Sequence, residues 1–362
     1  MSRQPPISIC FFLAILAILD FGVTPKTAHA QTVPRTTVRG KVLDDSTNAP
    51  LPLANVFVSN STIGTAADVD GKFELKGVPI GTQQIVASIV GYQPGSITLN
   101  LTDTLAVRIE LRLKQRPVQL SPVEVEAKEP VEWKANLDRF IKGFFGSTTD
   151  AQKCKMLNSQ VLDFSIDAET GQFAATAREP LHIVNAALGY KCDCILQLFS
   201  ETQQTSRYVG MTAFQPLQPQ DEEAAKEWKK NRRNAYYGSR RHFLTALINK
   251  RARQEGFEVH IIRSDWIQQA LKKSMGFDVD PDTLLTPSNA SFEKILSFPD
   301  QLQIIYTRTR PYQYSIIELS NPFVKVFTNG TLVNPLGFWV YGYWSSQRMA
   351  ESLPIDYEPE EK

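Results

Sequence analysis

VRGKV at residues 38–42 and LANVFV at residues 53–58 open the stretch that decides the fold, because apolar side chains recur there at every second position. This alternation predicts strands with one buried and one solvated face. Asp70-Gly71 tolerates positive φ and predicts a tight hairpin between two strands within residues 64–75. GVPIG at 77–81 predicts a second turn, and IVASIVGY at 85–92 predicts a central strand that is apolar on both faces. The stretch therefore predicts one small all-β sandwich.

The predicted sandwich ends in five alternating apolar residues between Leu105 and Leu113, so we place it at residues 36–113. Its motifs are GKV at 40–42, LANV at 53–56, GT at 64–65 with Asp68, GKF at 71–73, GVP-x-G at 77–81 and GY at 91–92. Together they resemble the carboxypeptidase-regulatory-like domain, a transthyretin-like or Ig-like β-sandwich of secreted and outer-membrane proteins in Bacteroidota-type bacteria. Ala67 stands where that family leads us to expect Thr or Ser. The resemblance implies a folding or docking module and gives no reason to expect peptidase activity.

The first 30 residues predict a secretory signal peptide. Arg3 precedes an apolar run from Ile7 to Leu19, and Ala28-His29-Ala30 forms an A-x-A cleavage site before Gln31. The alternative is an uncleaved anchor, but this run is shorter than the roughly 20 residues that a spanning helix needs. Cleavage leaves 332 residues without net charge, which argues against electrostatic attraction to nucleic acid or to a membrane. We expect an exported protein, periplasmic or associated with the outer membrane, with no transmembrane helix in its mature form.

Three cysteines follow the predicted cleavage site: Cys154, Cys192 and Cys194. In an exported protein they permit at most one intramolecular disulfide. Cys192 and Cys194 fall in one predicted strand and share a face, so they are poorly placed to bridge each other. We expect buried small hydrophobic residues, with a bridge from Cys154 to one of them as the alternative. This set, without a nearby histidine, makes a poor zinc site.

Beyond the sandwich, the proline-containing stretch 114–131 predicts a linker. The hydrophobic period then changes from that of a strand to that of a helix. The resulting order of helix, strands, helices and strands predicts an α+β domain over residues 132–358. The predicted helices are 132–145, 221–236 and 239–254, the last with Ser239 as N-cap, and the predicted strands are 161–168, 172–177, 190–199, 302–307, 315–319 and 324–332.

Short motifs recur along this second region: EPL at 179–181, LGY at 188–190, Trp228, NR at 231–232, AY at 235–236, GS at 238–239, HFL at 242–244, GYW at 342–344 and LPIDY at 353–357. Together they resemble a recurrent companion of the regulatory-like domain in the same bacterial group. That companion has no established activity, so the resemblance does not assign one to this region. Cys192-Asp193-Cys194 departs from it, because apolar or aromatic residues are expected at those positions.

Residues 226–253 contain ten Lys or Arg and a single acid, Glu227. This excess predicts an anion-binding face for lipopolysaccharide phosphates, an acidic glycan or an acidic envelope protein. The alternative is two solvated helix faces, because the apolar stripe of each helix lies elsewhere. Predicted export argues against nucleic acid as the partner. The arginines that form the predicted anion-binding site are Arg232, Arg233, Arg240 and Arg241.

A late aromatic run at residues 338–344 reads as a strand, in which Trp339, Tyr341 and Tyr343 share one face. These three residues form a predicted aromatic binding surface for a partner or a glycan. The alternative is that the helix of residues 133–145 covers them.

The sequence contains no H-E-x-x-H, no G-x-S-x-G and no phosphate-binding glycine-rich loop. Its mature histidines, His182, His242 and His260, are isolated from one another. Asp68 and Asp70 resemble half of a calcium loop, but the residues after them continue a strand. We therefore predict no catalytic residue, cofactor or metal.

These observations predict an exported, non-enzymatic binding or assembly module at the bacterial cell envelope. One alternative is an envelope hydrolase, a peptidase or glycosidase, whose active site is assembled from distant parts of residues 132–358. A cleft with two or more carboxylates, or a Cys and a His within hydrogen-bond reach, would favour it. Another alternative is an accessory to an outer-membrane transporter.

Overall fold

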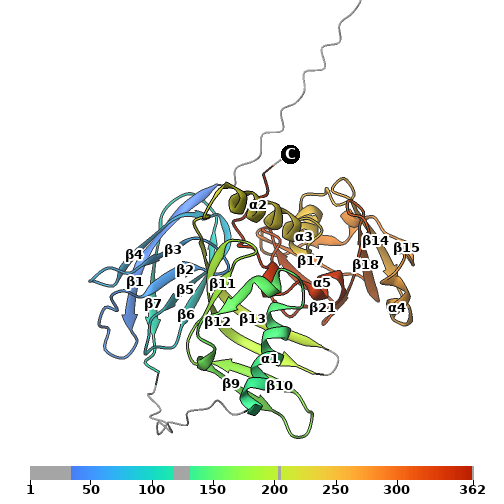
Figure 1. The fold of residues 1–362 in the computed structure, drawn as a ribbon. Helices are drawn as coiled ribbons and strands as arrows, with labels where there is room; N and C mark the ends of the chain where they lie inside the picture. The colour runs from blue at the N-terminus through green and yellow to red at the C-terminus, as the bar shows by residue number, and fades with distance from the viewer. Residues whose placement is uncertain (1–33, 117–130, 203–204, 361–362) are drawn as a thin grey trace, which may run out of the picture. The chain divides into compact units, whose positions relative to one another are not determined.

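Alternating apolar residues build the first two sheets of the computed structural model, which describes residues 34–116, 131–202 and 205–360 (Figure 1). The strands are β1 (Arg35–Asp44), β2 (Asn55–Val58), β3 (Gly64–Ala66), β4 (Lys72–Pro79), β5 (Gly81–Ser88), β6 (Gly95–Leu101) and β7 (Val107–Leu113). They form two sheets of order β4-β1-β7 and β3-β2-β5-β6. Val38, Val56 and Ile85 are fully buried between them. The predicted N-terminal β-sandwich is confirmed.

The predicted hairpin at Asp70-Gly71 is wrong, although the tight turn is present. β3 pairs with β2 and β4 pairs with β1, so the turn carries the chain from one sheet to the other. The carboxylate of Asp68 accepts hydrogen bonds from the backbone N–H groups of Asp70 and Lys72, at 2.9 and 2.8 Å. Gly71 has a φ of +71°, which favours glycine. The resemblance to a calcium loop is thus explained by a turn.

A buried aspartate fastens the end of β1 to the residues that follow β5 and β7. Asp44 accepts hydrogen bonds from the Ser46 hydroxyl at 2.6 Å and from the Tyr92 hydroxyl at 2.8 Å. Its carboxylate also accepts from the Gln115 amide at 2.9 Å. The hydrogen bond from Ser46, followed by those from Thr47 and Tyr92, holds the pKa of Asp44 well below its usual range.

Residues 131–360 form an α+β region with three further sheets. Their orders are β8-β11-β12-β10-β9 with β13 beside β12, β15-β14-β18-β19-β21, and β16-β17-β20. The helices are α1 (Val131–Phe145), α2 (Glu222–Tyr236), α3 (Arg240–Ile248), α4 (Ile267–Ala270) and α5 (Tyr343–Ser346), with single 3₁₀ turns at Ala151–Lys153, Ser159–Val161, Ser264–Trp266, Pro281–Thr283 and Met349–Glu351. The strands are β8 (Cys154–Met156), β9 (Leu162–Ile166), β10 (Phe173–Ala177), β11 (Leu181–Asn185), β12 (Tyr190–Glu201), β13 (Ser206–Pro216), β14 (Phe257–Ile262), β15 (Phe277–Asp278), β16 (Leu285–Pro287), β17 (Glu293–Leu296), β18 (Gln301–Tyr306), β19 (Gln313–Leu319), β20 (Val324–Phe327) and β21 (Phe338–Gly342).

The amphipathic pattern of α1 is buried against the sheet that contains β12. Phe140 and Phe144 have no solvent exposure, and the Phe140 ring lies 4.7 Å from that of Phe199 on β12. β13, which the sequence did not predict, pairs with almost the whole of β12. This long antiparallel pair supports one side of the candidate site described below.

α3 is shorter than predicted, because it ends at Ile248 and not at residue 254. Lys250 adopts a φ of +54°, and the backbone N–H of Arg251 turns back to the carbonyl of Ala246 at 2.8 Å. The predicted N-cap is confirmed, since the Ser239 hydroxyl accepts the N–H of His242 at 3.1 Å.

One end of the sandwich is anchored on the α+β region, and the described residues from Pro34 onward belong to one compact unit. Phe57 and Val86 of the sandwich are buried against Met211 and Ala213 of β13. The turn at 59–63, between β2 and β3, lies at this end.

The turn at 59–63 also binds residues 353–357, which we call the C-terminal segment. The N–H of Ile355 donates to the carbonyl of Asn60 at 2.7 Å, and Thr62 donates to the carboxylate of Asp356 through its N–H and its hydroxyl. The C-terminal segment therefore connects the anchored end of the sandwich to the α+β region.

The predicted signal peptide and most of the predicted linker lie outside the described residues. Among the helices that the structure describes, none is both long and apolar enough to span a bilayer.

Candidate functional site

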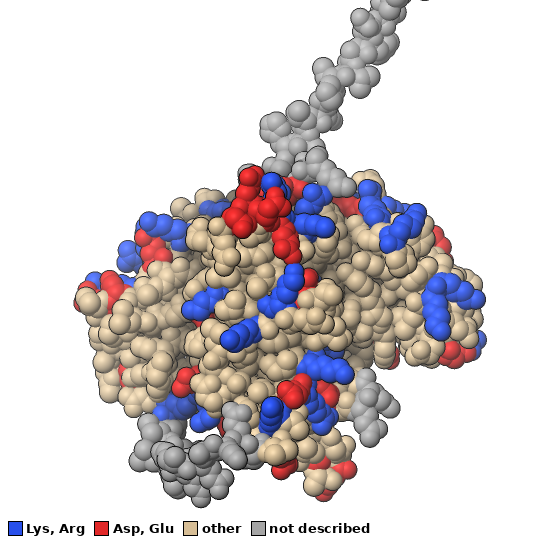
Figure 2. All heavy atoms as spheres, in the orientation of Figure 1, with Lys and Arg blue, Asp and Glu red and all other residues tan. Residues whose placement is uncertain are grey.

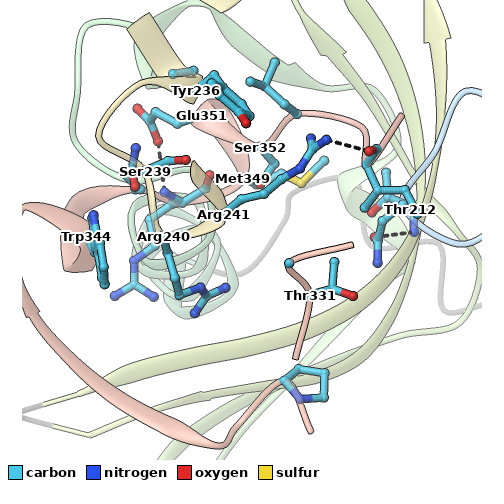
Figure 3. Close-up of a pocket in the computed structure, with 18 of the residues that line it drawn as sticks. Thr212, Tyr236, Ser239, Arg240, Arg241, Thr331, Trp344, Met349, Glu351 and Ser352 are labelled. Carbon is cyan, nitrogen blue, oxygen red and sulfur yellow. Dashed lines mark hydrogen bonds between the residues drawn. The ribbon is translucent and has the colours of Figure 1, made fainter. Parts of the chain in front are cut away.

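A cavity of about 340 Å³ opens where β13, the start of α3 and the C-terminal segment meet (Figure 3). Its size is at the lower end of the range for small-molecule sites in proteins. β13 contributes Tyr208 and Thr212, and the loop between β20 and β21 contributes Thr331. The sandwich contributes Asn60, from the turn that anchors it.

Arg241 lines this cavity but is committed to the C-terminal segment. Its guanidinium donates to the carbonyls of Pro354, Ile355 and Tyr357 at 2.7, 2.5 and 2.8 Å. Burial lowers the pKa of Arg241, and the charged groups around it oppose that shift. This predicted anion ligand therefore acts as a clamp within the chain.

Arg232 is committed in the same way. Together with Trp228 and Asn231 it donates to the main-chain carbonyls of residues 186–189, at distances between 2.7 and 3.2 Å. Gly189, with a φ of +69°, allows the close approach, because a Cβ there would lie 2.3 Å from the Trp228 ring. These residues carry the resemblance to the companion region, and here they fasten α2 to the turn between β11 and β12.

The side chains of Arg240 and Arg233 do not donate hydrogen bonds to main-chain carbonyls of the described residues. The Arg233 guanidinium lies 6.0 Å from the centre of the Tyr237 ring and does not line the cavity. Arg240 lines the cavity and is exposed to solvent. In Figure 3 the side chains of Arg240 and Arg241 diverge, and no dashed line reaches Arg240. The structure thus separates the four predicted arginines, and anion binding by them stays a prediction.

Sequence reasoning missed two charged residues of the cavity, Arg348 and Glu351. The Arg348 guanidinium donates to the carbonyl of Ser206 at 2.8 Å. The Glu351 carboxylate accepts from the Arg348 N–H at 2.9 Å and from the Thr148 hydroxyl. Burial raises the pKa of Glu351. Both residues follow the late aromatic run, where only a 3₁₀ turn at Met349–Glu351 directs them inward, and such a turn has no strong sequence signal.

Acids from other parts of the chain offset the basic excess of residues 226–253. Lys226 pairs with two acids of the first turn of α2, whereas Glu227, the single acid of the stretch, pairs at 2.7 Å with Lys153 outside it and offsets none of the excess. Lys229 pairs with Glu360. Figure 2 accordingly shows basic and acidic side chains next to one another on the viewed face.

The predicted aromatic surface is divided between two places. β21 ends at Gly342, whose φ of +76° turns the chain into α5, so Tyr343 leaves the strand face. Tyr343 packs on the core around Phe243, whereas Tyr341 packs on the cluster around Ile316. Trp339 lies under the Arg207 guanidinium, 4.4 Å from its ring centre.

Each histidine of the described residues has a polar neighbour of its own. His182 lies 2.6 Å from the Asp193 carboxylate across a strand pair. His242 is buried, accepts the N–H of Gly238 at its Nδ1 and therefore donates from Nε2 to Glu255 at 2.7 Å. Burial opposes ionisation of Glu255, but the hydrogen bond from His242 and nearby arginine charges hold its pKa below the usual value.

The pair of His260 and Ser274 is the arrangement nearest to a nucleophile with its base. Nε2 of His260 lies 3.3 Å from the Ser274 hydroxyl. Nδ1 of His260 is buried and has no hydrogen-bond partner in the part of the chain that the structure describes. A triad needs an acid at that nitrogen, so the geometry does not support one.

The three described cysteines are free thiols, so the alternative of a disulfide is not realised. Cys192 and Cys194 are buried in the core under α1, as expected for small hydrophobic residues. Burial raises the pKa of Cys154 to about 12 and that of Cys194 to about 11. Within residues 34–116, 131–202 and 205–360, no three His, Cys, Asp or Glu residues gather as a metal site.

Comparison with known proteins addresses the sandwich. Residues 38–125 match the family of the CarboxypepD_reg-like domain. The sandwich is a CarboxypepD_reg-like domain. The resemblance read from its motifs is thereby confirmed, and the match continues into residues that the structure does not describe.

A curated relative supports the bacterial group. The chain is 27% identical over 164 residues to the TonB-dependent receptor SusC of Bacteroides thetaiotaomicron. The match covers 44% of this chain and 15% of the receptor. The chain therefore spans about one seventh of that relative's length.

Solved structures share only a general likeness with this fold. The pilus 2b backbone protein of group B streptococcus is 20% identical, with a TM-score of 0.21 over 24% of this chain and 43% of that one. A putative carbohydrate binding protein from Bacteroides uniformis is 8% identical, with a TM-score of 0.20 over 81% of this chain and 99% of that one. Neither likeness supports a functional argument.

Proposed function

We propose that this protein is an exported, non-catalytic adaptor at the bacterial cell envelope, which binds an envelope protein through the free end of its CarboxypepD_reg-like domain. The observation that carries the proposal is the contrast between the two ends of the sandwich. One end is anchored on the α+β region through the turn at 59–63. The other end carries large apolar side chains in solvent.

Register places three exposed apolar residues together at this free end. Asn55 at the start of β2 is opposite Ala66 at the end of β3 and Ser88 at the end of β5. Leu53, Val69 and Val90 therefore follow or precede the same ends of three neighbouring strands, and they are 78%, 84% and 85% exposed. Apolar side chains gathered at one end of a domain are typical of an interaction surface. Because ion pairs occupy many of the surface lysines, a protein partner is favoured over lipopolysaccharide.

Charge substitutions at the free end test the proposal. The triple variant L53K/V69K/V90K and the wild type are crosslinked in envelope fractions, and captured proteins are identified by mass spectrometry. The matched control I166K/F277K/V333K places the same charges at exposed apolar positions of the α+β region. We expect the wild type and the control to capture the same envelope protein and the free-end variant to lose it. Capture by all three, or by none, would contradict the proposal.

The similarity to SusC favours a second candidate, an accessory to an outer-membrane transporter. In that case the captured partner is a β-barrel receptor of the outer membrane. Repeating the capture on separated inner-membrane, periplasmic and outer-membrane fractions distinguishes the two candidates. A partner that fractionates with the periplasm would exclude the transporter.

A further inference from the structure

Arg240 is a cation in a concave site with no partner of its own. Its guanidinium makes no hydrogen bond or ion pair with any residue of the described ranges 34–116, 131–202 and 205–360, although it lines the cavity (Figure 3). Arg241, the next residue, uses its donors on three carbonyls. This part of the chain therefore pairs one guanidinium with main-chain carbonyls and leaves the next without a partner among the described residues.

The surroundings of Arg240 are unfavourable to a lone charge. Desolvation by the surrounding protein lowers the pKa of Arg240, and Tyr208 opposes this shift. Arg240 is exposed as a residue, so water hydrates part of its guanidinium, and an anion would compensate for the hydration that the surrounding protein removes. Since the described residues supply neither, an anion from outside the chain is the natural partner.

The rest of the cavity is electrically suited to such an anion. Arg240, Arg241 and Arg348 face a single acid, Glu351. That carboxylate is already used by two donors within the chain. The cavity therefore has a net positive charge, and the guanidinium of Arg240 remains available to bind an anion.

The cavity also has apolar walls. Leu332, Pro335 and Leu353 line it beside the polar groups. A volume of about 340 Å³ accommodates a ligand of the size of a short peptide or a disaccharide. A guanidinium fork binds carboxylate and phosphate groups alike, but one available positive charge is balanced by a single carboxylate and not by a doubly charged phosphate.

We propose that this cavity is a binding site for a small organic carboxylate, which pairs with Arg240 and lays its apolar part against Leu332, Pro335 and Leu353. The carboxylate is the shared chemistry of two sources, the C-terminus of a peptide and an acidic sugar. This site is separate from the free end of the sandwich. Failure of the carboxylate-binding proposal would therefore leave the proposed adaptor function unaffected, and the reverse also holds.

Calorimetric titration of the purified chain tests the site with two matched pairs of probes. Acetyl-trialanine is compared with its C-terminal amide, and digalacturonic acid with its methyl ester. We expect one acid to bind and its neutral counterpart to fail, and the acid that binds identifies the source. If neither acid binds at millimolar concentration, or if acid and neutral probe bind equally, the proposal is wrong.

Two variants locate the binding. R240Q removes the free charge, and R233Q removes the same charge outside the cavity. We expect R240Q to weaken binding at least about tenfold, the effect of losing one charge-assisted hydrogen bond, and R233Q to change it less than about twofold. Equal affinities for R240Q and the wild type would overturn the assignment.

Chemical labelling of the wild type keeps the test valid if R240Q does not fold. Phenylglyoxal reacts with accessible guanidinium groups, and mass spectrometry reports each arginine. We expect Arg240 to react faster than Arg241, and the bound acid to slow its labelling about tenfold or more. Unchanged labelling of Arg240 in the presence of a bound acid would place that acid elsewhere.

Discussion

Replacing Arg241 by Gln should destabilise the protein by about 3 kcal/mol. A hydrogen bond from a charged donor contributes about 1.5–3 kcal/mol. Arg241 makes three such bonds to the C-terminal segment. They share one guanidinium, whose burial has a desolvation cost, so the three contributions do not add. The glutamine amide has two N–H donors for three carbonyls, so at least one carbonyl loses its partner.

Thermal and chemical unfolding measure this effect. An unfolding entropy near 2.1 cal/mol/K per residue gives about 0.7 kcal/mol/K for the compact unit of about 330 residues. The expected loss in R241Q is therefore about 4 °C in Tm. R233Q is the control, because the Arg233 side chain makes no hydrogen bond within the described residues, and the free energy of unfolding of this variant should change by less than about 0.5 kcal/mol. If R241Q and R233Q are equally stable, the clamp does not hold the C-terminal segment.

Three further predictions concern other features of the fold. G189A should lower the free energy of unfolding in urea by about 2 kcal/mol or more. G171A is its control, because Gly171 has a similar φ of +66° and nothing lies within 4 Å of the added Cβ, and it should lower that free energy by about 1 kcal/mol. Equal losses would contradict the packing of α2 on residues 186–189. D44N should lose stability relative to the wild type at pH 7, and the stability difference should narrow as the pH falls below about 4. A carboxyl with a lowered folded-state pKa stabilises the fold fully above its unfolded-state pKa and progressively less as the pH falls toward the folded-state pKa. A difference that is constant from pH 7 to pH 3 would refute this account of Asp44. Cys154 and Cys194 should resist alkylation by iodoacetamide at pH 7.5 in the native state, because burial raises both pKa values, and fast labelling without denaturant would refute the buried environment.

The sequence predicts the sandwich well because apolar and polar residues alternate along its strands and glycines mark its turns. It also predicts α1 and the N-cap of α3, where local patterns and packing agree. It fails at the Asp70-Gly71 turn, since a turn signal does not say which strands pair. The sequence does not predict β13, because this strand forms by pairing along β12, and a local sequence pattern does not reveal that pairing.

The site illustrates the same limit. Local composition identifies a run of arginines, but only the fold separates Arg232 and Arg241, which clamp main-chain carbonyls, from Arg240, which faces the cavity. The sequence pattern predicts a strand face for Tyr343 because the alternation of side chains continues past Gly342, where the strand itself ends. The positive φ of that glycine ends the strand, and a sequence pattern does not reveal it.

Site-specific photocrosslinking from Val90 in producing cells tests the central claim, that the free end of the sandwich docks on an envelope protein. A benzophenone amino acid replaces Val90, and the same amino acid at the exposed Phe277 in the α+β region serves as the control. We predict an irradiation-dependent adduct with one envelope protein from position 90 and none from position 277. The absence of any adduct from position 90, or the same adduct from both positions, would contradict the claim.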